Sequence, residues 1–181
     1  MRTSLLLSLA VFGLLLPGCK KEAAQTDNQE TETETVEVTL APDFTLSNID
    51  GEAFTLAEQR GNMVVMDFWA TWCHPCTEAM PHMQQLHEDY KDRHVSVVGI
   101  NVWEFDEDAD PAGYVREHEY TYHHLLDGAE VATAFGLTNQ IPVFFIIGFD
   151  GEILDERSGF TEEEIPEIRA ILDEYLAERG L

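Results

Sequence analysis

Short apolar runs separated by polar turns recur along the chain, and each run predicts one element of a mixed fold. Residues 64–69 and 95–102 are rich in apolar and β-branched residues, as is typical of buried central strands. Residues 143–147 form a third run of this kind. The Asp150-Gly151 turn predicts a hairpin that joins this run to a strand over residues 152–156.

Helical signals lie between and after these runs. Residues 77–90 repeat apolar side chains at helical spacing, so we expect a long helix there. Asp110 before Pro111 predicts an N-cap followed by the first helical position. A short helix is expected over residues 130–135, and the capping box at residues 161–164 predicts a last helix that runs to about residue 178.

An additional hairpin is expected at the start of the domain. Residues 44–46 and 53–56 flank a turn signal and predict two short antiparallel strands. The predicted order is therefore two strands, then βαβα(β)α, then ββα, with the third strand of the middle group optional. This order predicts one α/β domain over residues 41–181, in which a central mixed β-sheet is flanked by helices.

The N-terminus has the features of an export signal. Arg2 precedes an apolar run of about 12 residues, which is too short for an ordinary transmembrane helix. Residues 16–19, Leu-Pro-Gly-Cys, resemble a bacterial lipobox, which implies removal of residues 1–18 and lipid attachment to Cys19. The alternative is a plain secretory signal with an incidental cysteine. Both interpretations place the domain outside the cytoplasm, where disulfides persist.

Polar residues follow the lipobox. Residues 19–40 are rich in Glu and Thr with little to bury, so we expect a disordered tether behind the lipidated Cys19. Lys20 stands where many inner-membrane lipoproteins of Gram-negative bacteria carry aspartate, which favours outer-membrane anchoring. The formal net charge of −25 argues against nucleic acid as a partner.

A pair of cysteines indicates the chemistry. Cys73 and Cys76 lie between the strand at residues 64–69 and the helix at residues 77–90. A helix N-terminus stabilises a thiolate, so Cys73 is the expected nucleophile, exposed, and Cys76 is the more buried resolving thiol. Half a zinc site is the alternative interpretation, but the chain has no second CxxC, so no metal is expected.

Residues 67–76 resemble the active-site segment of the thioredoxin superfamily, and in particular the membrane-anchored TlpA/ResA-type thiol–disulfide oxidoreductases. Residues 41–46, 141–147 and 150–153 resemble further parts of that family, in family order. The resemblance covers about residues 41–178. It implies a thioredoxin-like fold with an N-terminal hairpin extension, and no cofactor besides the redox-active cysteine pair.

Asp67 is a carboxylate in an otherwise apolar strand, and because burial of an unpaired acid is costly, its presence indicates a function and a raised pKa. An acid that is hydrogen-bonded at the end of a strand is the alternative. In thioredoxins the matching acid helps to take the proton of the second thiol, and we expect Asp67 to do so for Cys76. TlpA-like proteins usually carry glutamate where this chain has Ala79. Glu78 is one place earlier, about 100° around the helix, so it does not replace that acid.

The resemblance implies further roles around the cysteines. Ile141–Pro142 resembles the family's cis-proline step, where the Ile141 backbone is expected to pair with a substrate strand. Trp72 is expected to cover the disulfide and to form part of an apolar docking patch. His74 and Pro75 are expected to tune the pair, His74 by adding positive charge when it is protonated.

These features predict a lipid-anchored reductase of protein disulfides that faces the periplasm. The family suggests apocytochrome c or copper-site proteins as substrates and a membrane electron donor of the DsbD/CcdA type. A disulfide oxidant or isomerase, a thiol peroxidase and a copper-delivery module are the alternatives. The acidic run at residues 104–110 predicts a solvated loop, with selection of a partner as the alternative.

Overall fold

The structure is a computed structural model, and it describes residues 38–181. The predicted signal segment, Cys19 and most of the predicted tether lie outside the described residues. Among the helices of the described part, none combines the length and the apolar character needed to cross a membrane.

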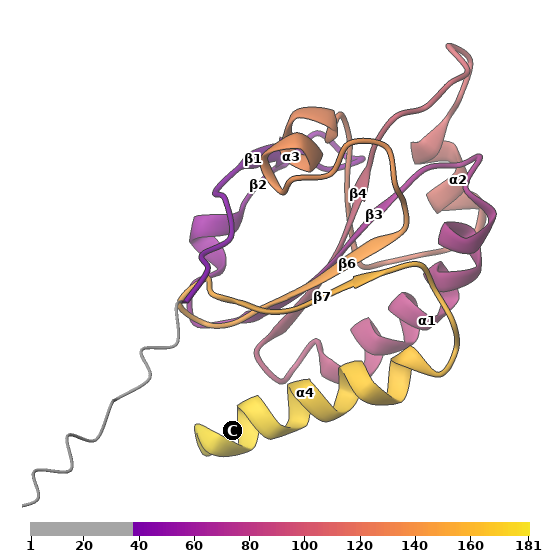
Figure 1. The fold of residues 1–181 in the computed structure, drawn as a ribbon. Coiled ribbons are helices and arrows are strands. Elements are labelled where there is room, and N and C mark those ends of the chain that lie inside the picture. Colours follow the sequence, from indigo (N-terminus) through magenta and orange to yellow (C-terminus); the bar gives the residue numbers. More distant parts are fainter. Residues whose placement is uncertain (1–37) are drawn as a thin grey trace, which may run out of the picture. The chain divides into compact units, whose positions relative to one another are not determined.

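Five strands form one mixed sheet in the order β5-β4-β3-β6-β7 (Figure 1). Strands β3, β4 and β5 run parallel, whereas β6 and β7 join as an antiparallel pair beside β3. The predicted mixed α/β sheet is therefore confirmed, and the optional third strand is present as β5. The strands are β3 (Met63–Trp69), β4 (Val95–Asn101), β5 (His123–Leu125), β6 (Val143–Ile147) and β7 (Ile153–Ser158).

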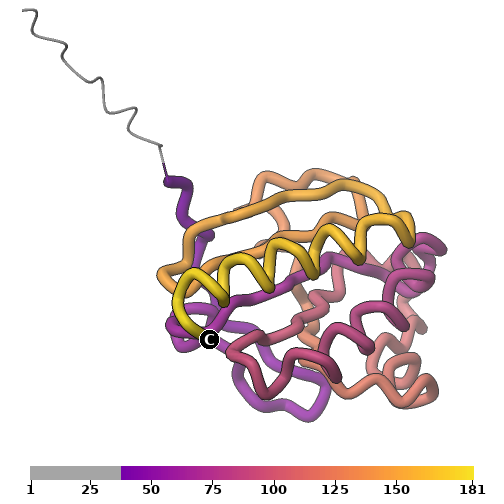
Figure 2. The backbone as a smooth tube through the Cα atoms, turned by 90° about the horizontal axis from the view of Figure 1, so that it is seen from below, coloured from indigo at the N-terminus to yellow at the C-terminus, as the bar shows by residue number. Residues whose placement is uncertain are grey.

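Helices and a hairpin cover the two faces of this sheet. Helices α1 (His74–Tyr90) and α4 (Glu164–Glu178) lie on one face, in front of the sheet in Figure 2. The predicted hairpin packs on the other face together with a short helix. The remaining elements are β1 (Thr45–Ser47), β2 (Ala53–Thr55), the 3₁₀ helix η1 (Leu56–Gln59), α2 (Pro111–Glu117) and α3 (Ala129–Ala134).

Alternation along β3 decides which side chains approach α1. Met66 and Phe68 belong to the apolar cluster shared with the hairpin and α3. Val65 belongs to the cluster on the α1 and α4 face, and Trp69 packs in the cluster that contains both cysteines. Because successive side chains of a strand point to opposite faces, Asp67 lies on the α1 side of the sheet with Val65 and Trp69.

Two helix starts differ from the sequence prediction. Helix α1 begins at His74, directly after Cys73, rather than at residue 77. Helix α4 begins at Glu164, at the end of the predicted capping box. The Glu164 carboxylate accepts a hydrogen bond from the Thr161 N–H at 3.2 Å, but no side chain caps the helix. The predicted capping box is therefore present only in part, because the Glu164 N–H donates to the Thr161 carbonyl rather than to the Thr161 hydroxyl.

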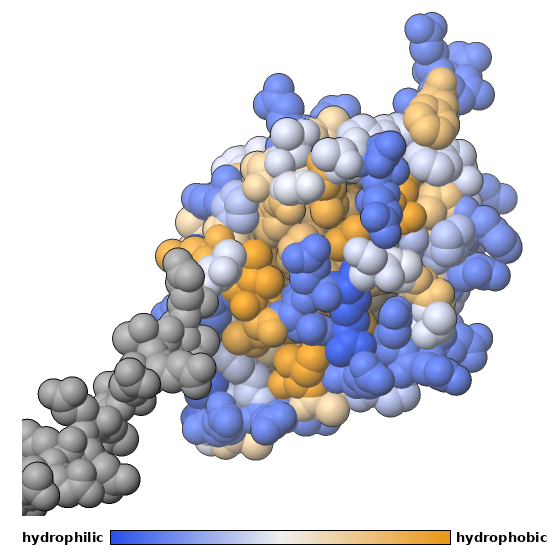
Figure 3. Space-filling model, in the orientation of Figure 1, coloured by the Kyte–Doolittle hydropathy of each residue, from blue (hydrophilic) through white to orange (hydrophobic). Residues whose placement is uncertain are grey.

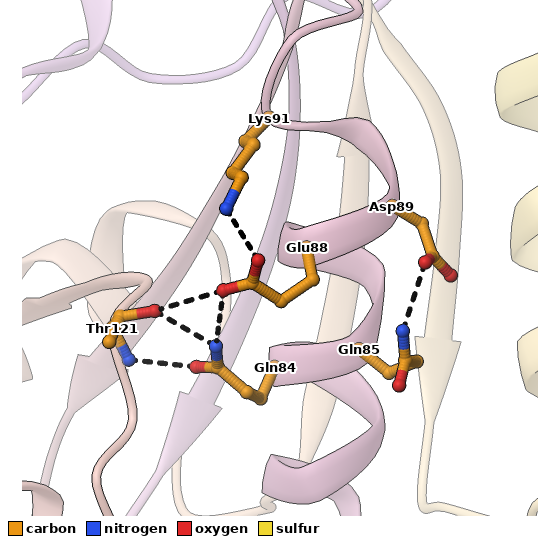
Figure 4. Close-up of polar contacts among 6 residues, drawn as sticks. All are labelled: Gln84, Gln85, Glu88, Asp89, Lys91 and Thr121. Carbon is orange, nitrogen blue, oxygen red and sulfur yellow. Dashed lines mark hydrogen bonds and ion pairs between the residues drawn. The ribbon is translucent and has the colours of Figure 1, made fainter.

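A polar clamp joins α1 to the segment that leads into β5 (Figure 4). The Gln84 side-chain oxygen accepts from the Thr121 N–H at 2.7 Å, and the Gln84 side-chain N–H donates to the Thr121 hydroxyl at 2.8 Å. Glu88, one turn further along, accepts from Lys91. The clamp fixes the residues that follow Thr121 against the helix that carries Cys76.

Candidate active site

The two predicted redox cysteines form a disulfide at the start of α1. The Cys73–Cys76 S–S distance is 2.00 Å and the Cα atoms are 5.2 Å apart. Cys73 is the N-cap residue, and its Sγ accepts a hydrogen bond from the Cys76 N–H at 3.3 Å. Pro75 lies in the first turn of the helix. The free N–H groups and the helix dipole therefore face the Cys73 sulfur, where they stabilise a thiolate in the reduced form.

Both cysteines are buried in this oxidised form. Cys73 is 4% exposed and Cys76 is 0% exposed. Cys76 is the more buried of the two, as predicted, but the expected exposure of Cys73 was wrong. The reason is that the disulfide belongs to an apolar cluster with Trp69 and Met80, against which Ile141 packs.

Asp67 lies on β3, six residues before Cys73, and is completely buried. Neither of its carboxylate oxygens has a hydrogen-bond partner among the described residues. Burial raises the pKa of Asp67 from 3.8 to about 7. The carboxylate is therefore poised to take up or release a proton near neutral pH.

His74 and Glu78 point along the exposed face of α1. Their side chains are 82% and 58% exposed, and His74 Nε2 lies 3.3 Å from the Glu78 carboxylate. A protonated His74 is therefore paired with Glu78, which weakens its expected effect on the sulfurs. Ala79 is buried in the core, at the position where the family usually carries glutamate. Glu78 faces solvent, as the helical rotation predicts.

An aromatic pair is exposed beside the disulfide. Trp72 is 43% exposed, and its indole N–H donates to the Trp103 carbonyl at 2.8 Å. Its ring stacks on Phe105, which is 78% exposed, with 4.4 Å between the ring centroids. The loop between β4 and α2, which carries Phe105, projects from the domain (Figure 1), and its end mixes hydrophilic and apolar residues (Figure 3). Phe105 was not identified from the sequence, because it lies within an acidic run.

Glu104 anchors this loop to the active-site turn. Its carboxylate accepts from the Thr71 N–H at 2.8 Å, from the Thr71 hydroxyl at 2.7 Å and from the Asn101 side chain at 2.7 Å. The interpretation of residues 104–110 as simply solvated was therefore wrong at Glu104. Nothing in the local sequence distinguishes this glutamate from its acidic neighbours, since its partners lie on other segments.

The loop before β6 lies against the same cluster. The Ile141–Pro142 peptide bond is cis, as the sequence predicted. Ile141 is half-buried and packs against the cluster that holds Cys73 and Cys76. Across residues 38–181, the His, Cys, Asp and Glu side chains form no group of three that could hold a metal ion.

Comparisons with known proteins agree with this geometry. Residues 38–155 match the model of the AhpC/TSA family. The thiol-disulfide oxidoreductase ResA of Bacillus thuringiensis subsp. konkukian is 30% identical over 129 residues, which cover 70% of this chain and 73% of that protein. ResA of Geobacillus thermodenitrificans is 32% identical over 127 residues, 69% of this chain and 71% of that protein.

A solved structure extends the likeness to the fold. The crystal structure of a thiol:disulfide interchange protein of the thioredoxin family from Chlorobium tepidum matches with a TM-score of 0.64 and 26% identity, over 77% of this chain and 97% of that one. Together with the Cys73–Cys76 disulfide at the start of α1, these matches show that the chain belongs to the thioredoxin-like AhpC/TSA family and is a thiol–disulfide oxidoreductase of the ResA type.

Proposed function

We propose that this chain reduces disulfides of cysteine-containing proteins in the cell envelope while Cys19 anchors it to a membrane by lipid. The observation that supports this most strongly is the Cys73–Cys76 disulfide at a helix N-terminus, on the sheet face that also buries the unpartnered Asp67. The lipobox-like segment before Cys19 supports the location.

The reaction begins with the reduced pair. The Cys73 thiolate, stabilised by the N-terminal amides of α1, attacks one sulfur of the substrate disulfide. The substrate S–S bond breaks, one substrate sulfur leaves as a thiolate, and a mixed disulfide joins the other to Cys73.

Cys76 then resolves the mixed disulfide. Its sulfur attacks the Cys73 sulfur, its proton passes to the Asp67 carboxylate, and the second substrate thiolate leaves. The Cys73–Cys76 bond forms, so two electrons have moved from the chain to the substrate. The raised pKa of Asp67, about 7, matches its role as proton acceptor.

Continued reduction needs a dithiol donor that returns two electrons to the Cys73–Cys76 disulfide. A membrane carrier of the DsbD/CcdA type is the donor we propose, with apocytochrome c and copper-site proteins as candidate substrates. The cysteine pair supplies the redox chemistry, and no other cofactor is proposed.

Substrate docking is assigned to the exposed apolar groups around the disulfide. Trp72 and Phe105 offer a stacked aromatic surface on one side. The Ile141 backbone offers hydrogen-bonding groups to an extended substrate segment, in the manner of strand addition.

Trapping of the mixed disulfide tests this function. Cys76→Ser should accumulate a covalent complex between Cys73 and a disulfide-containing protein, because resolution is blocked, whereas Cys73→Ser should accumulate none. The same yield of complex from both variants would contradict the roles assigned to the two cysteines. For the location, Cys19→Ser should move the protein from the membrane fraction to the soluble fraction, and retention in the membrane fraction would contradict lipid anchoring.

A further inference from the structure

Asp67 is one member of a row that crosses three neighbouring strands. It is paired with Gly99 in the register of β3 and β4, and Gly99 is paired with His124 in the register of β4 and β5. Register partners of parallel strands point to the same face, so Asp67 and His124 face the α1 side on either side of Gly99. Two strand spacings, roughly 10 Å, separate their backbones.

Gly99 has no side chain of its own, and three rings pack over it instead. A Cβ atom at Gly99 would lie 3.2 Å from Trp69 Nε1, 3.2 Å from Tyr122 Cε2 and 3.3 Å from His124 Nδ1. These distances are tighter than ordinary contacts, so a larger residue would displace the three rings. Trp69 Nε1 and His124 Nδ1 therefore lie over Gly99, between the strands that carry Asp67 and His124.

The polar atoms along this row share an unusual property. Within the described residues, both Asp67 oxygens, Trp69 Nε1, the Tyr122 hydroxyl and both His124 ring nitrogens are buried without a hydrogen-bond partner. Buried polar groups are nearly always hydrogen-bonded, and bridging water commonly supplies the missing partners. Six unpartnered atoms on four neighbouring residues form a row of buried polar groups between Asp67 and His124.

The row ends beside an open pocket. Tyr122 and His124 line a pocket of about 350 Å³, together with Ile49, Tyr120 and Arg116. The Gln84–Thr121 clamp (Figure 4) holds the start of this segment against α1, so the two residues have fixed positions relative to the helix that carries Cys76.

We propose that Tyr122 and His124 are positioning residues that conduct a proton from Asp67 to the solvent of this pocket, so that Asp67 is a carboxylate when Cys76 has to be deprotonated. The proposal rests on the function proposed above. Asp67 loses its proton through bridging water to His124, which accepts at one ring nitrogen and releases from the other. The Asp67 carboxylate then takes the Cys76 proton as the Cys73–Cys76 bond forms.

The groups around His124 keep it neutral between turnovers. Burial, with smaller contributions from the nearby His123 and His87, lowers the pKa of His124 from 6.5 to about 3. Tyr114 and Tyr120 are the other titratable side chains in the aromatic cluster packed around it. A neutral imidazole can accept a proton at one ring nitrogen and give one up from the other, so the charged form does not accumulate.

A two-phase thiol assay tests the proposal in chains that carry Cys19→Ser, so that Cys73 and Cys76 are the only thiols. Reduced chain mixed with the aromatic disulfide DTNB should release one thiolate when Cys73 attacks and a second when Cys76 resolves. We expect His124→Ala and Tyr122→Phe to slow the second phase at least fivefold and to leave the first unchanged. Added imidazole should restore the second phase in His124→Ala.

The control is His82→Ala, because His82 is a partly buried histidine of α1 whose ring packs on Phe160, outside the row. It should leave both phases unchanged. Tyr122→Phe removes only a hydroxyl, so it remains informative if His124→Ala does not fold.

An unchanged second phase in both variants would overturn the proton path, as would equal slowing of both phases or no response of His124→Ala to imidazole. Failure of the proposed function would look different, since the parent chain itself would then release one thiolate and no second.

Discussion

The Trp72 indole stacks on the Phe105 ring, with 4.4 Å between the centroids and 20° between the planes. One ring directly precedes Cys73, the proposed nucleophile, and the other lies on the loop between β4 and α2. Both rings are exposed to solvent, and such exposed aromatic surface beside a reactive group is typical of a site that contacts a partner.

Phe105→Ala should therefore weaken the binding of protein substrates more than the binding of small disulfides. Loss of one aromatic contact costs about 1 kcal/mol, which corresponds to a roughly fivefold rise in KM for a protein disulfide. KM for glutathione disulfide should change less, because a small disulfide can cover only a small part of the aromatic surface. Leu181→Ala, at another exposed apolar residue, is the matched control. Equal effects on both substrates would contradict a docking role for Phe105.

Glu104→Gln should loosen the loop that carries Phe105. The wild-type carboxylate accepts three hydrogen bonds, from Thr71 and Asn101, and an amide replaces one acceptor oxygen by a donor. Hydrogen bonds to a charged group contribute about 1.5–3 kcal/mol each, so we expect a loss on the order of 2 kcal/mol in the free energy of unfolding. Urea denaturation measures this, with Glu107→Gln on the same loop as control. Equal stability of the two variants would contradict the anchoring role of Glu104.

Asp67 should make the stability of the domain depend on pH. Burial raises its pKa from 3.8 to about 7, so the folded state holds the proton more tightly than the unfolded state does. The free energy of unfolding should therefore fall as pH rises from about 4 to about 7 and stay lower above that range, by a total on the order of 4 kcal/mol.

Asp67→Asn should remove this dependence, so the oxidised variant should be more stable than wild type at pH 8 and similar to it at pH 4. Denaturation at both pH values is the measurement, and Asp92→Asn, at an exposed acid, is the control. A variant that is less stable than wild type at pH 8 would contradict the assignment of Asp67 as a buried, unpartnered acid.

The elements that could be predicted from the sequence are those that neighbouring residues along the chain determine. Apolar runs marked β3, β4 and β6, and the Asp110 N-cap of α2 forms as expected, accepting from the Gly113 N–H at 2.7 Å. Strand β5 was left optional, because its three residues include two histidines and show no clear alternation.

The parts that sequence reasoning missed depend on contacts between distant segments. Glu104 reaches Thr71 across 33 positions, and the row of Asp67, Gly99 and His124 exists only in the register of three strands. The concentration of aromatic and histidine residues over 120–124 was the available signal for a site near β5. Burial of Cys73 was also missed, since it depends on the packing of Trp69, Met80 and Ile141 around the disulfide.

The reduction potential of the Cys73–Cys76 pair tests the reductase account most directly. It is measured by equilibrating the chain with a glutathione or thioredoxin couple and quantifying the disulfide. A dedicated reductase should give a value near that of thioredoxin, roughly −270 mV. A value near roughly −120 mV would identify the chain as an oxidant of folding proteins and would contradict the direction of electron flow proposed here.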